Sequence, residues 1–340
     1  MKAIAWRQEA EAWRRRGSHA DAMGAGGMNF HAAVRNCASF ALRAGEYIIR
    51  GIAMLRLRLY LLSTATLSMA AAALVAPAPA HAETYHTCKG FIDSVPATIS
   101  QQGVWCLRQD LSTGITSGTA ITVNTSNVTI DCNDFKLGGL AAGAGTGTLG
   151  IHANGQFNVS VRNCSIRGFL YGVTLEGGGA HLVERNGLDG NTYMGISVSG
   201  PGSMIRSNRV VDTGGSTTSA YGIFAANGVD VVDNTVNGVA ATDTNGSAFG
   251  IYSSANGEAS IAHNRVRGLA AASSGSTYGI FNANSGRLSV RDNDVQGTGV
   301  VGSIGVRCFT NTATARDNVV AGFETGVANC LLYGNTVNAN

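Results

Sequence analysis

The chain has 340 residues, of which 44% are hydrophobic and 13% charged, and its formal net charge is +3. Ten of the 24 Lys/Arg and four of the 21 Asp/Glu lie in residues 1–82, so residues 83–340 hold fourteen and seventeen, a net charge near −3. The positive total therefore gives no support for nucleic-acid binding, and we expect no nucleic acid among the partners.

Residues 1–53 are rich in arginine, lack a strong apolar period and precede a second candidate start, Met54. We interpret them as a non-native or disordered N-terminal extension, produced by an overlong gene start.

Residues 54–82 have the three parts of a secretory signal peptide. Two arginines are followed by an apolar run from Leu59 to Ala76 and by an Ala80-x-Ala82 cleavage site. A membrane anchor is the alternative, because the apolar run approaches the length that spans a bilayer. We expect a secreted or periplasmic protein with no membrane association after signal cleavage.

Six cysteines remain after the signal peptide, and none forms a Cys-x-x-Cys pair. An even number in an exported chain favours disulfides over metal ligation. Neighbours in the sequence suggest the pairs Cys88 with Cys106, Cys132 with Cys164, and Cys308 with Cys330, among fifteen connectivities that six cysteines allow.

Residues 83–126 are expected to form an N-terminal cap and the first strands, and residues 127–340 repeat a short pattern. Each repeat has an Asn two residues before an apolar side chain, and the second repeat has Cys164 in place of Asn. A Gly-aliphatic pair, such as Gly222-Ile223, lies between successive repeats. The asparagines are Asn133, Asn186, Asn208, Asn234, Asn264, Asn293, Asn318 and Asn335.

This spacing leaves room for three short strands per repeat, each too short to bury its own apolar face. Stacking the repeats about 4.8 Å apart pairs every strand with its equivalent in the next repeat and builds one continuous core. The Asn amides can then bond to one another as an inner ladder. The sequence therefore predicts an all-β, single-stranded parallel β-helix of about nine coils, in which the Asn residues are structural.

The coil pattern resembles the right-handed parallel β-helix proteins of the pectate-lyase-like superfamily. Residues 96–107 and 120–131 are also similar to the N-terminal cap and first coil of its exported bacterial members. The resemblance covers residues 88–340 and implies a right-handed helix. It implies no particular activity, since the superfamily includes lyases, hydrolases, epimerases and non-enzymes.

Alternation along the strand that begins at each Gly-aliphatic pair puts the aliphatic residue inward and the next residue outward. The longest loops precede these strands, and repeat proteins tend to bind partners beside such loops. The outward column reads His152, Thr174, Ser197, Phe224, Tyr252, Phe281, Arg307 and Ala328.

Phe224, Tyr252, Phe281 and Arg307 are our candidate carbohydrate-binding residues. The resemblance implies a sugar chain lying across them, and aromatic rings can pack on the apolar faces of pyranoses. The rings could instead stack on one another beneath the loops as a small additional core. A second set of aromatic residues, Tyr221, Phe249 and Tyr278, is expected to point into the core.

No complete catalytic set is found, so whether the chain is an enzyme stays open; a lyase or glycoside hydrolase is the class expected of one. Hydrolysis needs two neighbouring carboxylates, and the outward strands offer only Glu176, five coils from Arg307. Asp233, His263 and Asp292 share a turn position, which we interpret as turn chemistry and not as a metal site. No cofactor or metal is expected.

Three functions are considered. The first is an exported protein that binds a polysaccharide along the loop-flanked sheet, with or without cutting it. The second is a non-catalytic structural or surface solenoid that binds another protein, and the third is a polysaccharide lyase. We expect a monomer whose partner is a polysaccharide.

Overall fold

A computed structural model describes residues 87–215, 219–254 and 256–338. The predicted N-terminal extension (1–53) and signal peptide (54–82) lie outside the described residues. Within the described ranges, no helix has the length and apolar character needed to cross a membrane.

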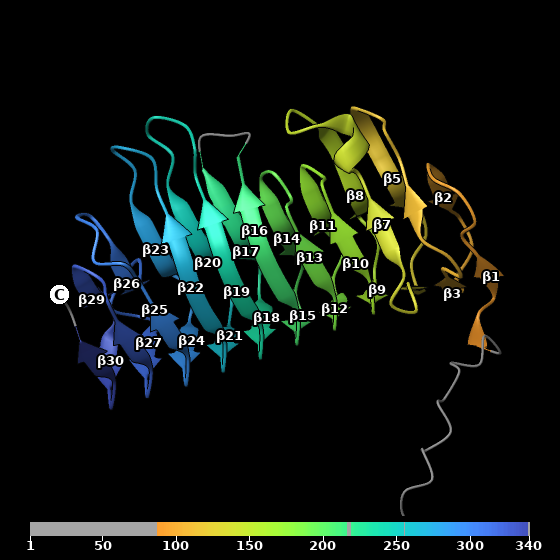
Figure 1. Cartoon of the computed structure of the whole chain (residues 1–340). Coiled ribbons are helices and arrows are strands. Elements are labelled where there is room, and N and C mark those ends of the chain that lie inside the picture. The colour runs from red at the N-terminus through yellow and green to blue at the C-terminus, as the bar shows by residue number, and fades with distance from the viewer. Residues whose placement is uncertain (1–86, 216–218, 255, 339–340) are drawn as a thin grey trace, which may run out of the picture. The chain divides into compact units, whose positions relative to one another are not determined.

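The described residues form three parallel sheets that run along one β-solenoid (Figure 1). Sheet A contains β1 (Gly90–Phe91), β3 (Gly103–Cys106), β6 (Val128–Asp131), β9 (Val159–Arg162), β12 (Leu182–Glu184), β15 (Ser203–Arg206), β18 (Val229–Val232), β21 (Ala259–Ala262), β24 (Leu288–Arg291), β27 (Thr314–Arg316) and β30 (Leu331–Tyr333). Sheet B contains β2 (Ala97–Ile99), β5 (Ser117–Val123), β8 (Gly147–Asn154), β11 (Tyr171–Glu176), β14 (Met194–Ser199), β17 (Ala220–Ala226), β20 (Ala248–Ser254), β23 (Thr277–Asn282), β26 (Ile304–Arg307) and β29 (Thr325–Ala328). Sheet C contains β4 (Leu111–Ser112), β7 (Lys136–Gly138), β10 (Ser165–Arg167), β13 (Gly187–Asp189), β16 (Arg209–Gly214), β19 (Thr235–Ala240), β22 (Arg265–Ala270), β25 (Asp294–Gln296), β28 (Val319–Ala321) and β31 (Thr336–Asn338).

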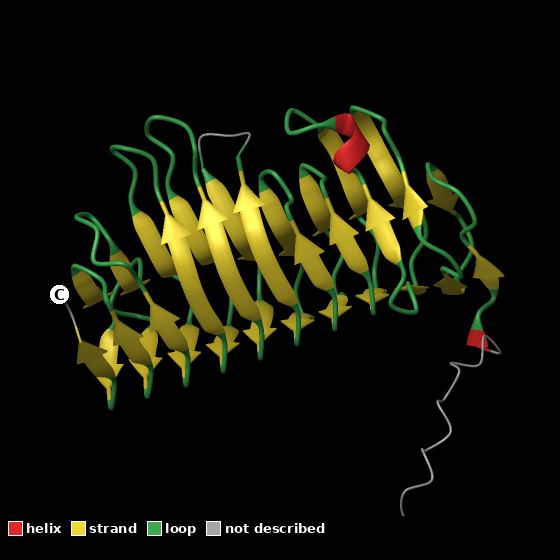
Figure 2. Ribbon diagram, viewed as in Figure 1, coloured by secondary structure: helices red, strands yellow, loops and turns green. Residues whose placement is uncertain are grey.

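The chain passes from sheet B to sheet A to sheet C in each coil, and each strand pairs with its equivalent in the next coil. Sheets of eleven, ten and ten strands in the described ranges agree closely with the expected number of coils. Figure 2 shows that strands and turns account for nearly the whole solenoid; a short 3-10 helix, η2 (Leu140–Ala142), lies in a loop before β8. The prediction of an all-β parallel solenoid is confirmed.

The core is a stack of aliphatic columns, one from each sheet. Ile223, Ile251 and Ile280 form part of the sheet B column, and each is completely buried. The glycine before each of these aliphatic residues also faces inward. A Cβ on Gly222 would lie 2.5 Å from Val236 Cγ1 in sheet C and 2.7 Å from the Gly250 carbonyl oxygen. Glycine is therefore required in this column because sheets B and C approach too closely for any side chain.

The predicted Asn ladder is present from Asn186 to Asn335. In each rung the side-chain amide donates to the Oδ1 atom of the next Asn, at 2.9–3.0 Å. The backbone N–H of each rung donates to the same oxygen. The ladder thus satisfies polar groups that the turn between sheets A and C would otherwise bury unpaired.

Asn133 does not belong to this ladder, contrary to the sequence prediction. Its amide donates instead to the Leu107 carbonyl, and Phe135 occupies the ladder position, since its carbonyl accepts from Ser165 N–H. The reason is a longer turn, in which Asn133 and Asp134 both have left-handed backbone angles (φ 48° and 64°). The two additional residues put Leu137, and not Phe135, in register with Ile166.

All three suggested disulfides form. The Cα–Cα distances are 5.8 Å for Cys88–Cys106, 4.7 Å for Cys132–Cys164 and 5.2 Å for Cys308–Cys330. These distances lie in the range that a disulfide can bridge. Each bond links neighbouring coils or the cap to the first coil, so the covalent network follows the stacking direction.

Candidate functional site

The outward column of sheet B has the register that the sequence predicts. Pairing in successive strands runs from His152 through Thr174, Ser197, Phe224, Tyr252, Phe281 and Arg307 to Ala328. Three of these side chains are aromatic and come from adjacent strands β17, β20 and β23. They form the centre of the candidate site.

The expectation that Tyr221, Phe249 and Tyr278 point into the core is wrong. They lie on the outer side of sheet B, where their rings contact those of the first column. Strict alternation fails at the glycine that follows each of them, because that glycine and the next isoleucine both face the core. The residues on either side of this Gly-Ile pair therefore share the outer face.

Two parallel columns of rings result, which we call the aromatic face: Phe224, Tyr252 and Phe281 in one column, and Tyr221, Phe249 and Tyr278 in the other. Within each column the ring centroids are 4.9–5.2 Å apart and the planes differ by 7–19°. Between columns the rings meet edge to face, at 69–88°. Both arrangements are favourable for aromatic quadrupoles.

Near-parallel rings at these centroid distances must overlap partly face to face. Part of each ring's face therefore packs against the neighbouring ring, as expected if the rings form a small additional core. They are not fully covered, however: five of the six rings are partly exposed, and only Phe249, at 8% exposure, is buried. The aromatic face is thus both a packed structural element and a surface open to solvent.

Two further tyrosines continue the ring contacts toward the N-terminus. Tyr193 lies edge to face with Tyr221, at 5.5 Å, and Tyr171 with Tyr193, at 5.2 Å. Tyr171 is in register with the second column, whereas Tyr193 lies one residue before Met194, which pairs with Tyr221. Sequence reasoning missed both residues, and the available signal for Tyr171 was an aromatic residue directly before the column glycine, Gly172.

Arg307 closes the other end of the aromatic face. Its guanidinium carbon lies 5.2 Å from the centroid of Phe281 and 5.8 Å from that of Tyr278, distances typical of cation–π contacts. One of its nitrogens also donates to the Tyr278 hydroxyl at 3.4 Å. No carboxylate of the described residues forms an ion pair with Arg307.

Burial raises the pKa of three tyrosines on or beside the aromatic face. Burial, followed by the neighbouring Tyr193, raises the pKa of Tyr221 from 10.0 to about 12. Burial also raises the pKa of Tyr252, and burial with the nearby Tyr193 and Glu176 raises that of Tyr171. At neutral pH these phenols therefore present hydroxyl groups and no charge.

Glu176 lies at the end of β11, where its carboxylate accepts from the Thr174 hydroxyl at 3.4 Å. Five strand-to-strand steps separate it from Arg307, as the sequence indicated. At about 4.8 Å per step the two side chains are roughly 24 Å apart. They cannot act on one bond together.

The turn residues Asp233, His263 and Asp292 lie beside the Asn ladder in a shallow depression of about 410 Å³. All three have left-handed backbone angles, which accounts for Asp and His at this position. The Arg291 guanidinium contacts both His263 and Asp292, at 3.2 and 3.0 Å. In the described part of the chain no three His, Cys, Asp or Glu side chains come together to hold a metal.

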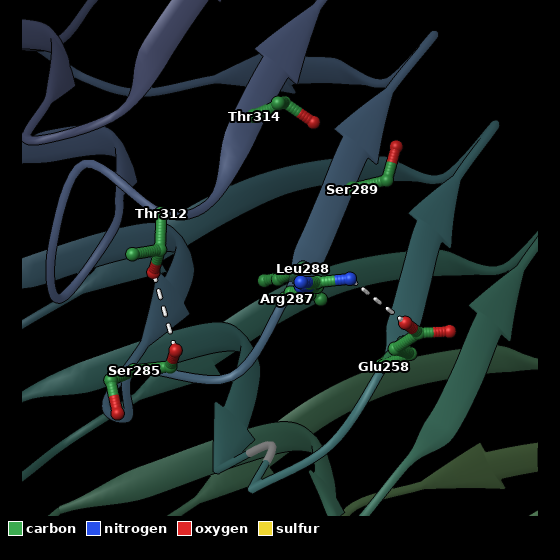
Figure 3. A pocket seen from close by; sticks show the side chains of 8 residues that line it. Glu258, Ser285, Arg287, Leu288, Ser289, Thr312 and Thr314 are labelled. Atoms are coloured by element: carbon green, nitrogen blue, oxygen red, sulfur yellow. Dashed lines mark hydrogen bonds and ion pairs between the residues drawn. The ribbon is translucent and has the colours of Figure 1, made fainter.

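A larger depression, of about 650 Å³, lies on the sheet A side at strands β21, β24 and β27 (Figure 3). Figure 3 shows the Arg287–Glu258 ion pair, at 3.6 Å, across it and Thr312 donating to the Ser285 carbonyl. Both charged side chains are more than 80% exposed, so their pairing contributes little. The floor carries hydroxyl groups from Ser289 and Thr314 and no acid–base pair.

A second, exposed Asn ladder runs along the turn between sheets B and A, and sequence reasoning missed it. Asn284 donates to Asn256 at 2.8 Å, Asn256 to Asn227 at 3.2 Å, and Asn227 to the Ser199 hydroxyl at 3.0 Å. These residues lie in turns of differing length, which hid their common register. The ladder ties together the coils that carry the aromatic face.

Residues 113–266 match the family model described as right handed beta helix region. No curated protein matches this chain. Among solved structures, the chain titled Geobacillus virus E2 ORF18 is similar, with 11% identity and a TM-score of 0.26. The match covers 72% of this chain and 54% of that one, so this chain spans about half the length of the viral protein.

The three parallel sheets and the family match together define a right-handed parallel β-helix protein. The pectate-lyase-like superfamily is consistent with this fold. The predicted right-handed parallel β-helix is therefore confirmed. Three disulfides agree with a secreted or periplasmic location.

Proposed function

We propose that this exported β-helix protein binds an extended polysaccharide along the aromatic face of sheet B, without cleaving it. The observation that carries the proposal is the face itself. It repeats the same aromatic pair in three adjacent coils and keeps most of its rings partly open to solvent. A linear polymer with repeating apolar and hydroxyl groups fits a linear array of this kind.

The chemistry of the face supports contact with a sugar chain. The partly exposed rings offer apolar surface at little cost in side-chain entropy. The hydroxyls of Tyr221 and Tyr252 stay protonated and can hydrogen-bond to sugar hydroxyls. Arg307 offers guanidinium donors at the end of the array, held in place by Phe281 and Tyr278.

Binding without cleavage is proposed because the outer face lacks a reactive pair. Among the described strands of sheet B, Glu176 is the one acidic residue, and it is too far from Arg307 to cooperate with it. A general base or nucleophile must lie within hydrogen-bonding reach of its partner groups.

The alternative is a structural solenoid that binds another protein. It is favoured by the mutual stacking of the rings, which stabilises the coils without any ligand. The two functions make different demands on the exposed polar atoms of the aromatic face. A purely structural face needs the stacked rings alone, whereas polysaccharide binding also uses the hydroxyl and guanidinium groups.

Affinity electrophoresis through gels that contain a panel of neutral and acidic polysaccharides tests the proposal. Tyr252→Phe and Arg307→Gln remove polar atoms and leave the stacked rings in place. Phe157→Ala is the matched control, since Phe157 is 58% exposed and lies outside sheet B. We expect the first two variants to lose retention roughly tenfold, about 1.4 kcal/mol, and the control to be unchanged.

No retention of the unchanged protein on any polysaccharide, or equal retention of all variants, would refute polysaccharide binding by this face. Release of an unsaturated, ultraviolet-absorbing product from uronic acid polymers would instead show that the protein is a polysaccharide lyase. Thermal unfolding of each variant shows whether the stack has stayed intact.

A further inference from the structure

The exposed Asn ladder borders the aromatic face. Asn227 follows β17, Asn256 follows β20 and Asn284 follows β23, and these three strands carry the six rings. The Asn284 amide also donates to the Ser254 hydroxyl at 3.0 Å. Ser254 lies two residues after Tyr252 in β20, and therefore on the same side of the strand. The rings and the amides thus form one continuous surface at the ends of these strands.

The exposed Asn ladder leaves hydrogen-bonding groups free to meet a ligand. A side-chain amide has two N–H donors and an oxygen with two lone pairs. Within the ladder, Asn227 uses one donor to Ser199 and Asn256 uses one donor to Asn227. Among the described residues, the second donor of each has no partner, and the side-chain oxygen of Asn284 accepts no hydrogen bond. Asn227 and Asn256 are exposed, so a ligand can reach these groups.

The bonds between rungs hold the free groups in place. Water satisfies an exposed amide about as well as another amide does, so these bonds add little to the stability of the fold. They do fix the orientation of each amide before a ligand arrives. A pre-organised group loses less entropy on binding, and the exposed Asn ladder is therefore better suited to binding than to support.

The surface formed by the rings and the ladder is uncharged over three coils. β17, β20 and β23 contain no Asp, Glu, Lys, Arg or His. On sheet B the nearest charged residues are Arg307, one strand beyond β23, and Glu176, two strands before β17. Glu258 and Arg287 lie in the turns of the ladder, but they pair with each other across the depression on sheet A.

This lack of charge bears on the kind of polymer that fits. A uronic acid polymer carries a carboxylate on each sugar. Bringing those carboxylates against an uncharged and partly apolar surface removes water from them and supplies no partner charge, which is costly. Arg307 can balance one carboxylate at the end of the array and not a row of them. A neutral polymer meets no such cost.

We propose that the polysaccharide bound by the aromatic face is a neutral one, and that the exposed Asn ladder binds its hydroxyl groups. This inference rests on the proposed function and adds the class of polymer to it. Sugar hydroxyls donate and accept hydrogen bonds, as do the free N–H and oxygen atoms of the ladder. The rungs come from the same three coils as the rings, so a chain that lies along the rings also lies along the amides.

Matched polymers test the class. Hydroxyethyl cellulose and carboxymethyl cellulose share a backbone and differ in charge, as do dextran and carboxymethyl dextran. In affinity electrophoresis with these pairs and the wider panel, we expect the unchanged protein to be retained by a neutral polymer, and about tenfold less by an acidic counterpart. Retention by acidic polymers alone, or equal retention by both members of a pair, overturns this inference and leaves polysaccharide binding standing. No retention by any polymer refutes the proposed function, and this inference with it.

A matched pair of variants tests the ladder. Asn227 and Asn158 are both exposed residues of turns between sheets B and A, with left-handed backbone angles (φ 60° and 53°), and each donates one bond of 3.0 Å to the preceding coil. Glycine tolerates this angle, so Asn227→Gly and Asn158→Gly each remove an amide without straining the backbone. Asn158 follows β8, three strands before β17 in sheet B, and lies away from the six rings. We expect Asn227→Gly to weaken retention by the neutral polymer about fivefold, and Asn158→Gly to leave it unchanged.

Asn284→Ala is a second variant, and it should weaken retention to a similar extent because it removes the rung that contacts Ser254. Thermal unfolding of each variant shows that the fold is intact. Unchanged retention of both Asn227→Gly and Asn284→Ala, or an equal loss in Asn158→Gly, would show that the exposed Asn ladder does not bind the polymer, and overturns the proposal.

Discussion

Asn234 lies in the middle of the buried ladder, and its replacement by alanine measures what one rung contributes. Its Oδ1 atom accepts from the backbone N–H and the side-chain amide of Asn208, at 2.9 and 3.0 Å. Its own amide donates to the Ile205 carbonyl at 2.9 Å and to Asn264 Oδ1 at 3.0 Å. Asn234→Ala removes all of these bonds from a site that is 99% buried.

The backbone N–H of Asn208 loses the most, because Asn234 Oδ1 is its hydrogen-bond acceptor. The other partners keep a second bond: the Asn208 amide still donates to the Val183 carbonyl, and Asn264 Oδ1 still accepts from the Asn234 backbone. A buried polar group left without a partner costs about 1–3 kcal/mol. We therefore expect Asn234→Ala to lower the free energy of unfolding by about 2 kcal/mol.

Chemical denaturation followed by circular dichroism measures this loss. Asn284→Ala is the matched control, because Asn284 makes one rung of the second ladder at a partly exposed site, has no left-handed backbone angle, and water can replace its bonds. Its cost should stay below about 1 kcal/mol. Equal costs for the two variants, or a cost under 1 kcal/mol for Asn234→Ala, would show that the inner ladder does not stabilise the turns in the way described.

Two further predictions concern the aromatic face and the first coils. Because the pKa of Tyr221 is raised to about 12 in the folded state, its contribution to stability is fully present below pH 10 and is lost as the pH rises toward 12. Thermal melting between pH 9 and 12 should show a loss of stability that is smaller in Tyr221→Phe. An equal loss of stability in both proteins would refute this prediction. Replacing Cys132 and Cys164 together by serine opens a disulfide between residues 32 apart and should lower the free energy of unfolding by about 3–4 kcal/mol, measured by denaturation. Serine at Cys132 combined with Cys164→Asn should cost less, because the new Asn side chain can extend the ladder onto Asn186. Identical costs for the two double variants would contradict a stabilising role of the ladder at this position.

The fold could be predicted because stacking converts each recurring sequence position into a straight line of contacts. The Gly-aliphatic pair fixed the register of sheet B across eight coils, and the pairing of Phe224 with Tyr252 and of Tyr252 with Phe281 followed from it. The disulfide pairs followed in the same way, since cysteines close in sequence lie in neighbouring coils.

The failures arose where local backbone geometry departs from regular alternation. Tyr221 turned outward because Gly222 lets the chain put two successive residues on the core side. Asn133 left the ladder because two left-handed residues lengthen its turn. Neither effect is a property of composition or periodicity: each depends on how closely a neighbouring backbone approaches, which becomes visible only when the coils are assembled.

The direction of the inner ladder has a consequence for how the solenoid is built. In every rung from Asn186 to Asn318 the side-chain amide donates to the Oδ1 atom of the rung that follows in the chain. The same amide also donates to a backbone carbonyl of the preceding coil. The amides are therefore aligned dipoles that polarise one another along the interior. Each ladder oxygen receives two donors from the preceding rung, the backbone N–H and the side-chain amide. The loss of any one rung is therefore felt by the coil that precedes it, whose two donors share that single acceptor.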